Sequence, residues 1–203
     1  MPQHEAYTFP RLTRADYPLM RDWLAQPHVR AWWGDPDAEI ALIDEDIDTG
    51  PTDMRLVALG GVPFAYVQDY PAHHWGSPQF APFSPGARGM DTFLGEASFL
   101  GQGHAAGYLR QRCGALLDEG ATAVVIDPSP DNERAVRAYR RAGFVPRGIA
   151  PCEDGDRVLV MDAGQIVADA TPRDLLAGRA GPVADALVAV PREQARRLAE
   201  MGA

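Results

Sequence analysis

Two glycines between a predicted strand and a predicted helix constrain the fold of this chain more than any other feature. The stretch "SFLGQGHAAGYLRQRCGALL", Ser98 to Leu117, contains Gly101, Gly103 and Gly107 and continues directly into a helical pattern. A glycine-rich turn that opens a helix presents unpaired backbone N–H groups at the positive end of the helix dipole. The stretch therefore predicts a strand–turn–helix unit that binds a phosphate or pyrophosphate.

Two common phosphate-binding loops fit this turn poorly. A Walker A loop is excluded because all 19 basic residues are arginines and the chain contains no lysine. A Rossmann turn fits better, since Gly101-x-Gly103-x-x-Ala106 is followed by Asp127 near the expected acidic position. The residues "GEASF" before the turn do not form a buried strand, however, and the chain closes with a hairpin instead of further β-α units. Coenzyme A is the third candidate ligand.

The composition is that of a globular protein with an acidic surface. The net charge is −9, and residues 1–162 hold the excess because residues 163–203 carry equal numbers of acidic and basic residues. Such a surface repels nucleic acid and anionic membranes and attracts cations. No apolar run is long enough to span a bilayer and no signal peptide is recognisable, so we expect a cytoplasmic protein without membrane or nucleic-acid partners. Cys113, Cys152 and the pair His73-His74 lack metal-ligand spacing, and no metal is expected.

Periodicity and turn residues predict an alternation of strands and helices. A short strand at residues 6–12 leads into a helix that begins near Thr13, and a second helix starts at Asp35 before Pro36. Gly60 and Gly61 join two β-rich runs as a hairpin. The later elements are a strand at 88–95, the helix after the glycine turn, a strand at 122–128, a helix at 132–141 and paired strands at 144–150 and 156–162.

Residues 71–87 form a long loop between these elements. The segment contains four prolines and no periodicity, together with Trp75, Phe80 and Phe83. A loop of this length in a small domain usually has a function. We expect a lid or a dimer contact here.

The order of elements, the glycine turn and "DPSPDNERAVRAYRRAGF" together resemble the GNAT superfamily of acetyl-CoA-dependent N-acetyltransferases. The phosphate loop of that family, Q/R-x-x-G-x-G/A, matches residues 100–105, with Leu100 in place of the polar first residue. The resemblance implies an α/β (α+β) GNAT fold, in which helices flank a mixed, mostly antiparallel sheet. We expect this domain to cover residues 1–162 and to be followed by a short, non-catalytic helical extension at 163–203.

Four ordered segments narrow the resemblance to the aminoglycoside 6′-N-acetyltransferases: "RAWWGD", "YVQDY", "RGMDTFLGEASFLGQGHAAGYL" and "VIDPSPDNERAVRAYRRAGF". This implies transfer of an acetyl group from acetyl-CoA to the 6′-amine of aminoglycoside antibiotics, which confers resistance, by a monomer or homodimer. Two alternatives stay open: an N-acetyltransferase for a siderophore precursor or other small amine, and a catalytically inactive coenzyme A-binding module.

Acetyl transfer to an amine requires a group that takes up the ammonium proton and a group that protonates the departing thiolate. Asp91, on the strand before the phosphate loop, is the candidate base or amine anchor; the alternative is a surface carboxylate. Tyr139 is the candidate general acid, because its phenol has an ordinary pKa near 10; the alternative is a core aromatic residue.

The resemblance also implies the binding residues. For the cofactor these are Phe93, Leu94, Gly101, Gln102, Gly103, His104, Ala105, Asn132 and Tyr139, with Asn132 expected either to cap its helix or to contact the pantetheine arm. For the aminoglycoside, or another polyamine, they are Trp32, Trp33, Gln68, Tyr70, Asp91 and Asp127. Of Trp32 and Trp33, one is expected in the core and one toward the substrate. Eight acids between Asp35 and Asp53 are expected to form a solvated helix face that also attracts a polycation.

The end of the chain carries a different resemblance. The segment "RVLVMDAGQIVADATPRDLL" is similar to the end of the ATPase subunit of osmoprotectant ABC importers. No Walker motif precedes it, so ATP binding is not implied.

Overall fold

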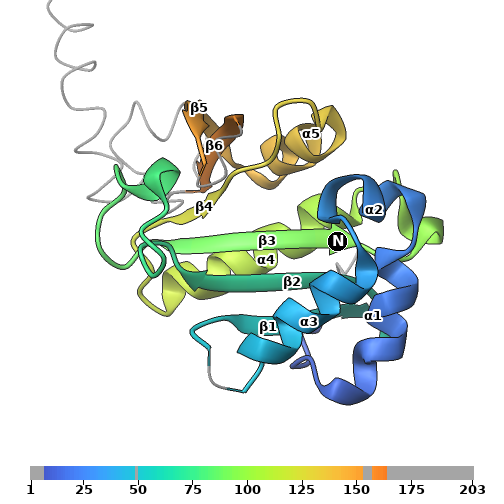
Figure 1. Ribbon diagram of the computed structural model, residues 1–203. Coiled ribbons are helices and arrows are strands. Elements are labelled where there is room, and N and C mark those ends of the chain that lie inside the picture. Colours follow the sequence, from blue (N-terminus) through green and yellow to red (C-terminus); the bar gives the residue numbers. More distant parts are fainter. Residues whose placement is uncertain (1–6, 49, 153–156, 164–203) are drawn as a thin grey trace, which may run out of the picture. The chain divides into compact units, whose positions relative to one another are not determined.

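A single mixed sheet organises the protein in the computed structural model, which describes residues 7–48, 50–152 and 157–163 (Figure 1). Its strand order is β1-β2-β3-β4-β6-β5. All neighbouring strands are antiparallel except β3 and β4, which run parallel. The strands are β1 (Asp53–Leu59), β2 (Val62–Pro71), β3 (Arg88–Leu94), β4 (Val124–Ile126), β5 (Val145–Pro151) and β6 (Arg157–Ala163). The predicted mixed, mostly antiparallel sheet is confirmed.

The predicted hairpin across Gly60 and Gly61 joins β1 to β2. Both glycines have positive φ, at 58° and 82°. Two such residues are what the tightest hairpin turns require, and side chains other than glycine adopt this conformation only with strain. The turn therefore sets the pairs Leu59↔Val62 and Ala58↔Pro63, after which a bulge shifts the register so that Val57 pairs with Ala65.

The parallel pair β3 and β4 is joined over a short distance only. Its paired residues are Arg88↔Val124 and Gly89↔Val125. Beyond Gly89 the described residues of β3 have no partner on β4, although β3 stays paired with β2 as far as Leu94. The sheet is therefore split at the carboxyl ends of β3 and β4.

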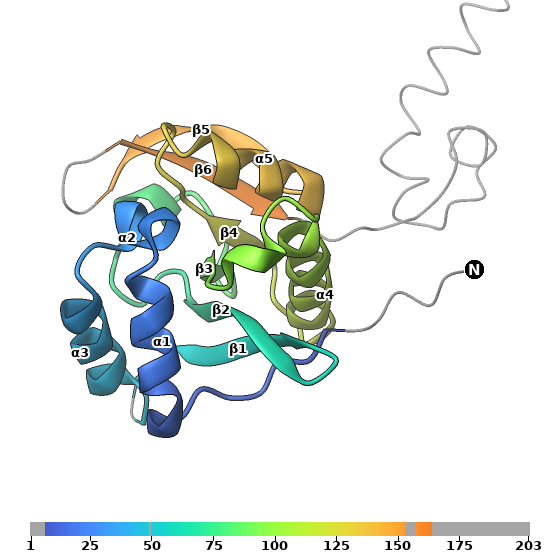
Figure 2. The same cartoon turned by 90° about the vertical axis from the view of Figure 1, so that its right-hand side faces the viewer.

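Helices cover both faces of the sheet (Figure 2). On one face lie α1 (Tyr17–Leu24), α2 (Pro27–Trp33) and α3 (Pro36–Asp46), which bury Met20, Trp23, Val29 and Ile40 against Tyr66 and Phe93. On the other face lie α4 (His104–Asp118) and α5 (Glu133–Ala142), whose apolar residues form a larger core with Val67, Met90 and Val124. The expected flanking of the sheet by helices is confirmed.

Two expectations for the N-terminal part are wrong in detail. Residues 6–12 do not form a regular strand; the described part pairs with β1 through isolated bridges, Thr8↔Ala58 and Arg11↔Arg55. Pro10 lies between them and has no N–H to donate, which interrupts the ladder. Helix α2 was not predicted, although Pro27 stands in its first turn and Gly34, with a φ of 86°, ends it.

The loop at residues 71–87 packs against the sheet. Its ends are joined by a hydrogen bond from Ala72 N to Ala87 O of 2.9 Å. A short helix (Pro78–Phe80) buries Phe80 in a cluster with Tyr70 and Val125. The loop therefore packs in a fixed position beside β3 and β4. Its role as a lid or dimer contact stays a prediction.

The proposed helical extension lies outside the described residues from Gly164 onward, so the domain boundary at residue 162 stays a prediction. Strand β6, which the sequence analysis assigned to the end of the catalytic domain, is described and pairs with both β4 and β5. Within the described part of the chain, no helix is both long and apolar enough to cross a bilayer.

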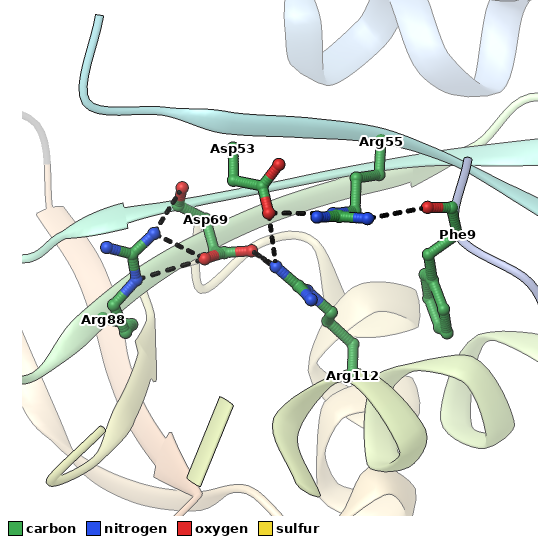
Figure 3. A network of polar contacts seen from close by, with 6 residues as sticks. All are labelled: Phe9, Asp53, Arg55, Asp69, Arg88 and Arg112. Atoms are coloured by element: carbon green, nitrogen blue, oxygen red, sulfur yellow. Dashed lines mark hydrogen bonds and ion pairs between the residues drawn. The ribbon is translucent and has the colours of Figure 1, made fainter. Parts of the chain in front are cut away.

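A buried carboxylate ties three strands and a helix together (Figure 3). Asp69 on β2 is 1% exposed and accepts hydrogen bonds from two arginines. The Nη2 of Arg88, on β3, lies 2.6 Å from Oδ1, and the Nη2 of Arg112, on α4, lies 2.6 Å from Oδ2. Arg112 also donates to Asp53 on β1, at 2.8 Å. Each carboxylate oxygen is satisfied, as burial of a charge requires.

We expect Asp69→Asn to destabilise the protein by about 3–5 kcal/mol, because removal of one partner leaves a buried arginine uncompensated. Urea unfolding at pH 7 measures this change. The matched control is Asp37→Asn, since Asp37 pairs with Arg21 at the surface, where its side chain is 80% exposed. That variant should unfold almost as the unmodified protein does. Equal losses in the two variants would contradict the importance of the buried network.

Candidate active site

A cleft of about 860 Å³ opens where β3 and β4 separate. Its walls come from the end of β3, the residues after β4, helix α2 and the N-terminal ends of α4 and α5. Most residues predicted for the site line this cleft. They are Trp32, Trp33, Gln68, Asp91, Phe93, Leu94, Gly101, Gly103, His104, Ala105, Asp127, Asn132 and Tyr139. Gln102 and Tyr70 are the predicted residues that do not.

The glycine turn forms an open cradle at the start of α4. Gly101 and Gly103 have φ values of 76° and 86°, and nothing lies within 4 Å of the position that a Cβ would take at either residue. The glycines are thus required by the backbone conformation, and the space before the turn is clear. The side chain of Gln102 turns back to the carbonyl of Ser98 and leaves this space open.

The first backbone N–H groups of α4 lack acceptors. The first helical hydrogen bond runs from Gly107 N to Gly103 O, at 3.2 Å, and within the described residues His104, Ala105 and Ala106 have no backbone acceptor. Free N–H groups together with the helix dipole favour an anion. The cradle therefore fits a pyrophosphate group, and Leu100 does not alter the backbone donors that form it.

Helix α5 adds positive charge to the same cleft. Asn132 caps the helix, since its Oδ1 accepts from Ala135 N at 3.1 Å. Arg134, Arg137 and Arg141 line the cleft, which the sequence analysis missed; Asp131 and Glu133 line it too, and Glu133 pairs with Arg137 at 2.9 Å. The spacing of the arginines, three and four residues, is typical of one helix face and could have indicated a shared environment.

Tyr139 contributes a buried phenol to the cleft. The residue is 7% exposed and packs against Phe144. Burial raises the pKa of Tyr139, and the neighbouring Tyr108, Asp91 and Asp127 raise it further. No described residue forms a hydrogen bond to its hydroxyl group, so a protonated donor faces the cleft without an acceptor. The ring of Tyr139 packs in the core while the residue also lines the cleft, so a core position does not conflict with a role as general acid.

Asp91 accepts hydrogen bonds from two side chains of the neighbouring strand β2, those of Gln68 and Tyr70. Gln68 Nε2 donates to Asp91 Oδ2 at 2.9 Å, and Tyr66 in turn donates to Gln68 Oε1 at 2.7 Å. Burial raises the pKa of Asp91, while hydrogen bonds from Gln68 and Tyr70 partly offset the increase. Gln68 and Tyr70, predicted to bind substrate, thus orient the candidate base.

A second carboxylate follows β4. Asp127 accepts a hydrogen bond from Gln79 Nε2 at 3.0 Å. Gln79 comes from the loop at 71–87 and was not predicted as a site residue. No local pattern indicates this contact, because it joins residues that are far apart in the chain.

The paired tryptophans lie in different environments. Trp33 packs edge-on against Phe93 with ring centroids 4.9 Å apart, and also against Tyr66. Trp32 is 47% exposed and presents its ring at the cleft. Trp33 is therefore the packed residue of the two.

The acidic run around α3 is partly neutralised by two arginines. Asp37 pairs with Arg21, and Asp44 and Asp48 pair with Arg14. Asp35 caps α3 by accepting from the backbone N–H groups of residues 37 and 38. Glu39 differs from these, because it lines the cleft and its pKa is raised by burial and by the charge of Asp91.

Comparison with known proteins agrees with this geometry. A family profile described as an acetyltransferase (GNAT) domain matches residues 13–150. The aminoglycoside N(6′)-acetyltransferase type 1 of Klebsiella pneumoniae is 31% identical over 171 residues, which cover 80% of this chain and 85% of that protein.

Two solved structures are also similar. The complex of the aminoglycoside acetyltransferase AAC(6′)-Ib with ribostamycin and coenzyme A has a TM-score of 0.70 at 27% identity, over 81% of this chain and 99% of that one. Its complex with coenzyme A and kanamycin has a TM-score of 0.66 at 27% identity, over 79% and 95% of the two chains. The comparisons do not bear out the resemblance of the end of this chain to an ABC importer ATPase. The residues of this chain from Gly164 onward lie outside the described part.

We expect Asp91→Asn to leave the protein as stable as before at pH 7, or more stable. The folded-state pKa of Asp91 is raised, so its ionised form destabilises the fold above that pKa, and this effect disappears as the pH falls below the ordinary value. The difference between variant and unmodified protein should therefore shrink from pH 7 toward acid. Thermal unfolding from pH 7 to pH 4 measures it; a variant less stable at pH 7 would contradict the burial of this charge.

Proposed function

Because the chain belongs to the acetyltransferase (GNAT) domain family, we propose that it transfers the acetyl group of acetyl-CoA to the 6′-amine of aminoglycoside antibiotics and so confers resistance to them. One observation carries the proposal: a half-buried carboxylate, a phenol without a described acceptor and an open helix N-terminus line a single cleft. The relatives named for aminoglycoside acetylation support the choice of substrate.

The residues present fit coenzyme A. The N–H groups of residues 102–105 would hold its pyrophosphate, and Phe93, Leu94 and Asn132 would border its pantetheine arm. Arg134 and Arg141, which form no ion pair with a described residue, place positive charge in the cleft, where an anionic cofactor would be stabilised, whereas Arg137 pairs with Glu133. When bound, acetyl-CoA supplies the acetyl thioester.

Asp91 would bind the substrate ammonium and take up its proton. An ammonium group whose pKa lies a few units above neutral is only about 1% free base at pH 7, so assistance by a carboxylate matters. Its raised pKa makes Asp91 a stronger base than an exposed aspartate. The hydrogen bonds from Gln68 and Tyr70 fix the direction of its oxygens.

Tyr139 would supply the proton for the leaving sulfur. Its raised pKa keeps the hydroxyl protonated at neutral pH. Since no described residue accepts this proton, the hydroxyl is free to donate into the cleft.

The substrate would meet negative charge and one flat ring. Asp91, Asp127 and Glu39 lie in the cleft, and Trp32 exposes an indole face beside them. Carboxylates bind ammonium groups, and an aromatic face suits both sugar rings and cations. Positive charge on α5 and negative charge near Asp91 would thus separate the cofactor from the acceptor.

We expect the purified protein to release coenzyme A from acetyl-CoA in the presence of kanamycin or ribostamycin, as measured with a thiol reagent. Asp91→Asn should lower kcat/KM by about 10²–10⁴, the usual contribution of a general base. A panel of small amines, including spermine and a hydroxylamine siderophore precursor, tests the alternative substrates. Thiol release with those amines and with no aminoglycoside would contradict the proposal.

Tyr139→Phe should lower kcat by about 10² or more and leave KM for the aminoglycoside nearly unchanged, because the proton is needed only in the transition state. Thermal stability should not fall, since the hydroxyl has no described partner. Tyr17→Phe is the matched control, because the Tyr17 hydroxyl bonds Asp44 at 2.9 Å, away from the residues that line the cleft. A fall in kcat of equal size in both variants would exclude the role of Tyr139.

A further inference from the structure

The N-terminal segment at residues 7–12 joins the edge of the sheet to helix α4. It pairs with β1 through two isolated bridges. Its first residue, Tyr7, is bound at both backbone polar groups by one side chain of α4: Tyr7 N donates to Gln111 Oε1 at 3.0 Å, and Gln111 Nε2 donates to Tyr7 O at 2.7 Å. The two residues are 104 positions apart in the chain, so only the folded domain brings them together.

The side chain of Tyr7 reaches from this anchor to the first residue of α4. Its hydroxyl oxygen lies 3.1 Å from Nδ1 of His104. A Cβ at Gly107 would lie 2.6 Å from the same oxygen and 2.8 Å from Cε2 of the ring. Glycine is unfavourable in a helix interior, and the close approach of the tyrosine explains its presence here. We call Tyr7, His104, Gly107 and Gln111 the Tyr7 clamp.

Aromatic rings surround the imidazole of His104. Its centroid lies 5.2 Å from that of Phe99 and 5.6 Å from that of Phe64, and these two rings stack on each other at 4.5 Å. Tyr7 packs edge-on against the imidazole at 6.1 Å, and both residues are half-buried. The rings restrict the position of the imidazole, and the hydrogen bond to Tyr7 fixes which of its nitrogens faces the tyrosine.

The hydroxyl group of Tyr7 also determines which ring nitrogen carries the proton. Burial raises the pKa of Tyr7, and the charge of Arg110 partly offsets the increase, so the hydroxyl is protonated at neutral pH. Among the described residues its one acceptor is Nδ1 of His104. A neutral imidazole that accepts at Nδ1 carries its proton on Nε2. Nε2 is therefore a donor, and no described residue forms a hydrogen bond with it.

This donor belongs to the wall of the cleft. His104 lines the cleft, whereas Tyr7 and Gln111 do not. Because Nδ1 faces Tyr7, the edge of the ring that carries Nε2 is left for the cleft. The first backbone N–H groups of α4 lie at the same turn. One further N–H group beside them suits a pyrophosphate, since hydrogen bonds to a charged acceptor are the stronger kind.

We propose that Tyr7 is a positioning residue for the cofactor: its hydroxyl group holds His104 so that Nε2–H contacts the pyrophosphate of coenzyme A. Tyr7 itself touches no reacting atom. A donor that is already fixed in place loses little freedom when the ligand binds, which strengthens binding. The inference rests on the proposed function only in taking coenzyme A as the cofactor, and it extends the cofactor site to the N-terminal segment and to Gly107.

Tyr7→Phe removes one hydroxyl group and keeps the ring beside Gly107. Kd for coenzyme A, measured by titration calorimetry, should rise about three- to tenfold, because a hydrogen bond to a charged group is weakened. KM for acetyl-CoA should rise by the same factor, whereas kcat at saturating acetyl-CoA and KM for kanamycin should not change. Tyr17→Phe, which removes a hydroxyl group far from the clamp, is the control. An unchanged Kd in Tyr7→Phe would overturn the proposal.

A double-mutant cycle tests whether Tyr7 acts through His104. His104→Leu should raise Kd for coenzyme A about tenfold. Tyr7→Phe should have no further effect in that background, because the hydroxyl group then has no nitrogen to hold. Losses that multiply in the double variant would show that Tyr7 acts independently of His104 and would overturn the proposal.

Dephospho-coenzyme A identifies the phosphate that is contacted. This ligand lacks the 3′-phosphate and keeps the pyrophosphate. Tyr7→Phe and His104→Leu should therefore weaken its binding by the same factors as they weaken the binding of coenzyme A. Losses confined to coenzyme A itself would overturn the assignment of Nε2 to the pyrophosphate.

Gly107→Ala displaces Tyr7 without removing a polar group. The added Cβ would push the hydroxyl group away from His104, so Kd for coenzyme A should rise at least as much as in Tyr7→Phe. Gly114→Ala is the matched control in the same helix, because nothing lies within 4 Å of its Cβ position. That variant should keep the Kd and unfold at a higher temperature, since alanine favours a helix. Equal Kd values in the two glycine variants would overturn the role of Gly107.

These outcomes separate the inference from the proposed function. Binding of coenzyme A that Tyr7→Phe leaves unchanged, with turnover of kanamycin, would overturn the role of Tyr7 and leave the acetyltransferase activity standing. A raised Kd in Tyr7→Phe, with no acetylation of any aminoglycoside by the unmodified protein, would support the Tyr7 clamp and contradict the proposed reaction.

Discussion

The geometry of the site depends on the buried carboxylate of Asp69. Through Arg88 it holds β3 at the residues where β3 is still paired with β4, and through Arg112 it holds α4 (Figure 3). Asp91 lies three residues beyond Arg88, at about 3.3 Å per residue along the strand. The phosphate cradle ends at the start of α4, about two helical turns before Arg112. One ion-paired cluster therefore sets the distance between the candidate base and the cofactor turn, while β3 and β4 are free to separate.

The polar groups of the site contrast with this satisfied network. The pKa of Asp91 is raised by burial, the hydroxyl of Tyr139 has no described acceptor, and Gln79 Oε1 has no donor. The partly desolvated charge of Asp91 and the unsatisfied Gln79 Oε1 cost stability in the ligand-free fold. Such local costs are expected where a protein binds a ligand that completes them, and they are compensated elsewhere by packing and by pairs such as Asp69 with Arg112.

The sequence predicts what depends on local structure. The hairpin at Gly60 and Gly61, the glycine turn before α4 and most of the order of helices and strands along the chain follow from residue preferences that act within a few positions. The irregular pairing of residues 7–12 follows from Pro10, and helix α2 could have been found from Pro27 and Gly34. The environments of Trp32 and Trp33 could not be distinguished, because adjacent residues on a short helix differ only in what packs against them. Gln79 could not be found, since its contact with Asp127 spans the fold.

The carboxylates that matter for the site are those in the cleft, more than the net acidic charge of the whole chain. Arg14 and Arg21 offset two of the three charges of Asp37, Asp44 and Asp48, and physiological salt screens the remaining field beyond about 8 Å. Glu39 and Asp91 are different, because the charge of Asp91 disfavours ionisation of Glu39 within the same cleft. A substrate with several ammonium groups relieves this repulsion when it lies near both carboxylates, whereas a monoamine relieves it less. For the proposed function, a preference for a polycation would therefore be expected from the pair Glu39 and Asp91 in the cleft more than from the total charge of −9.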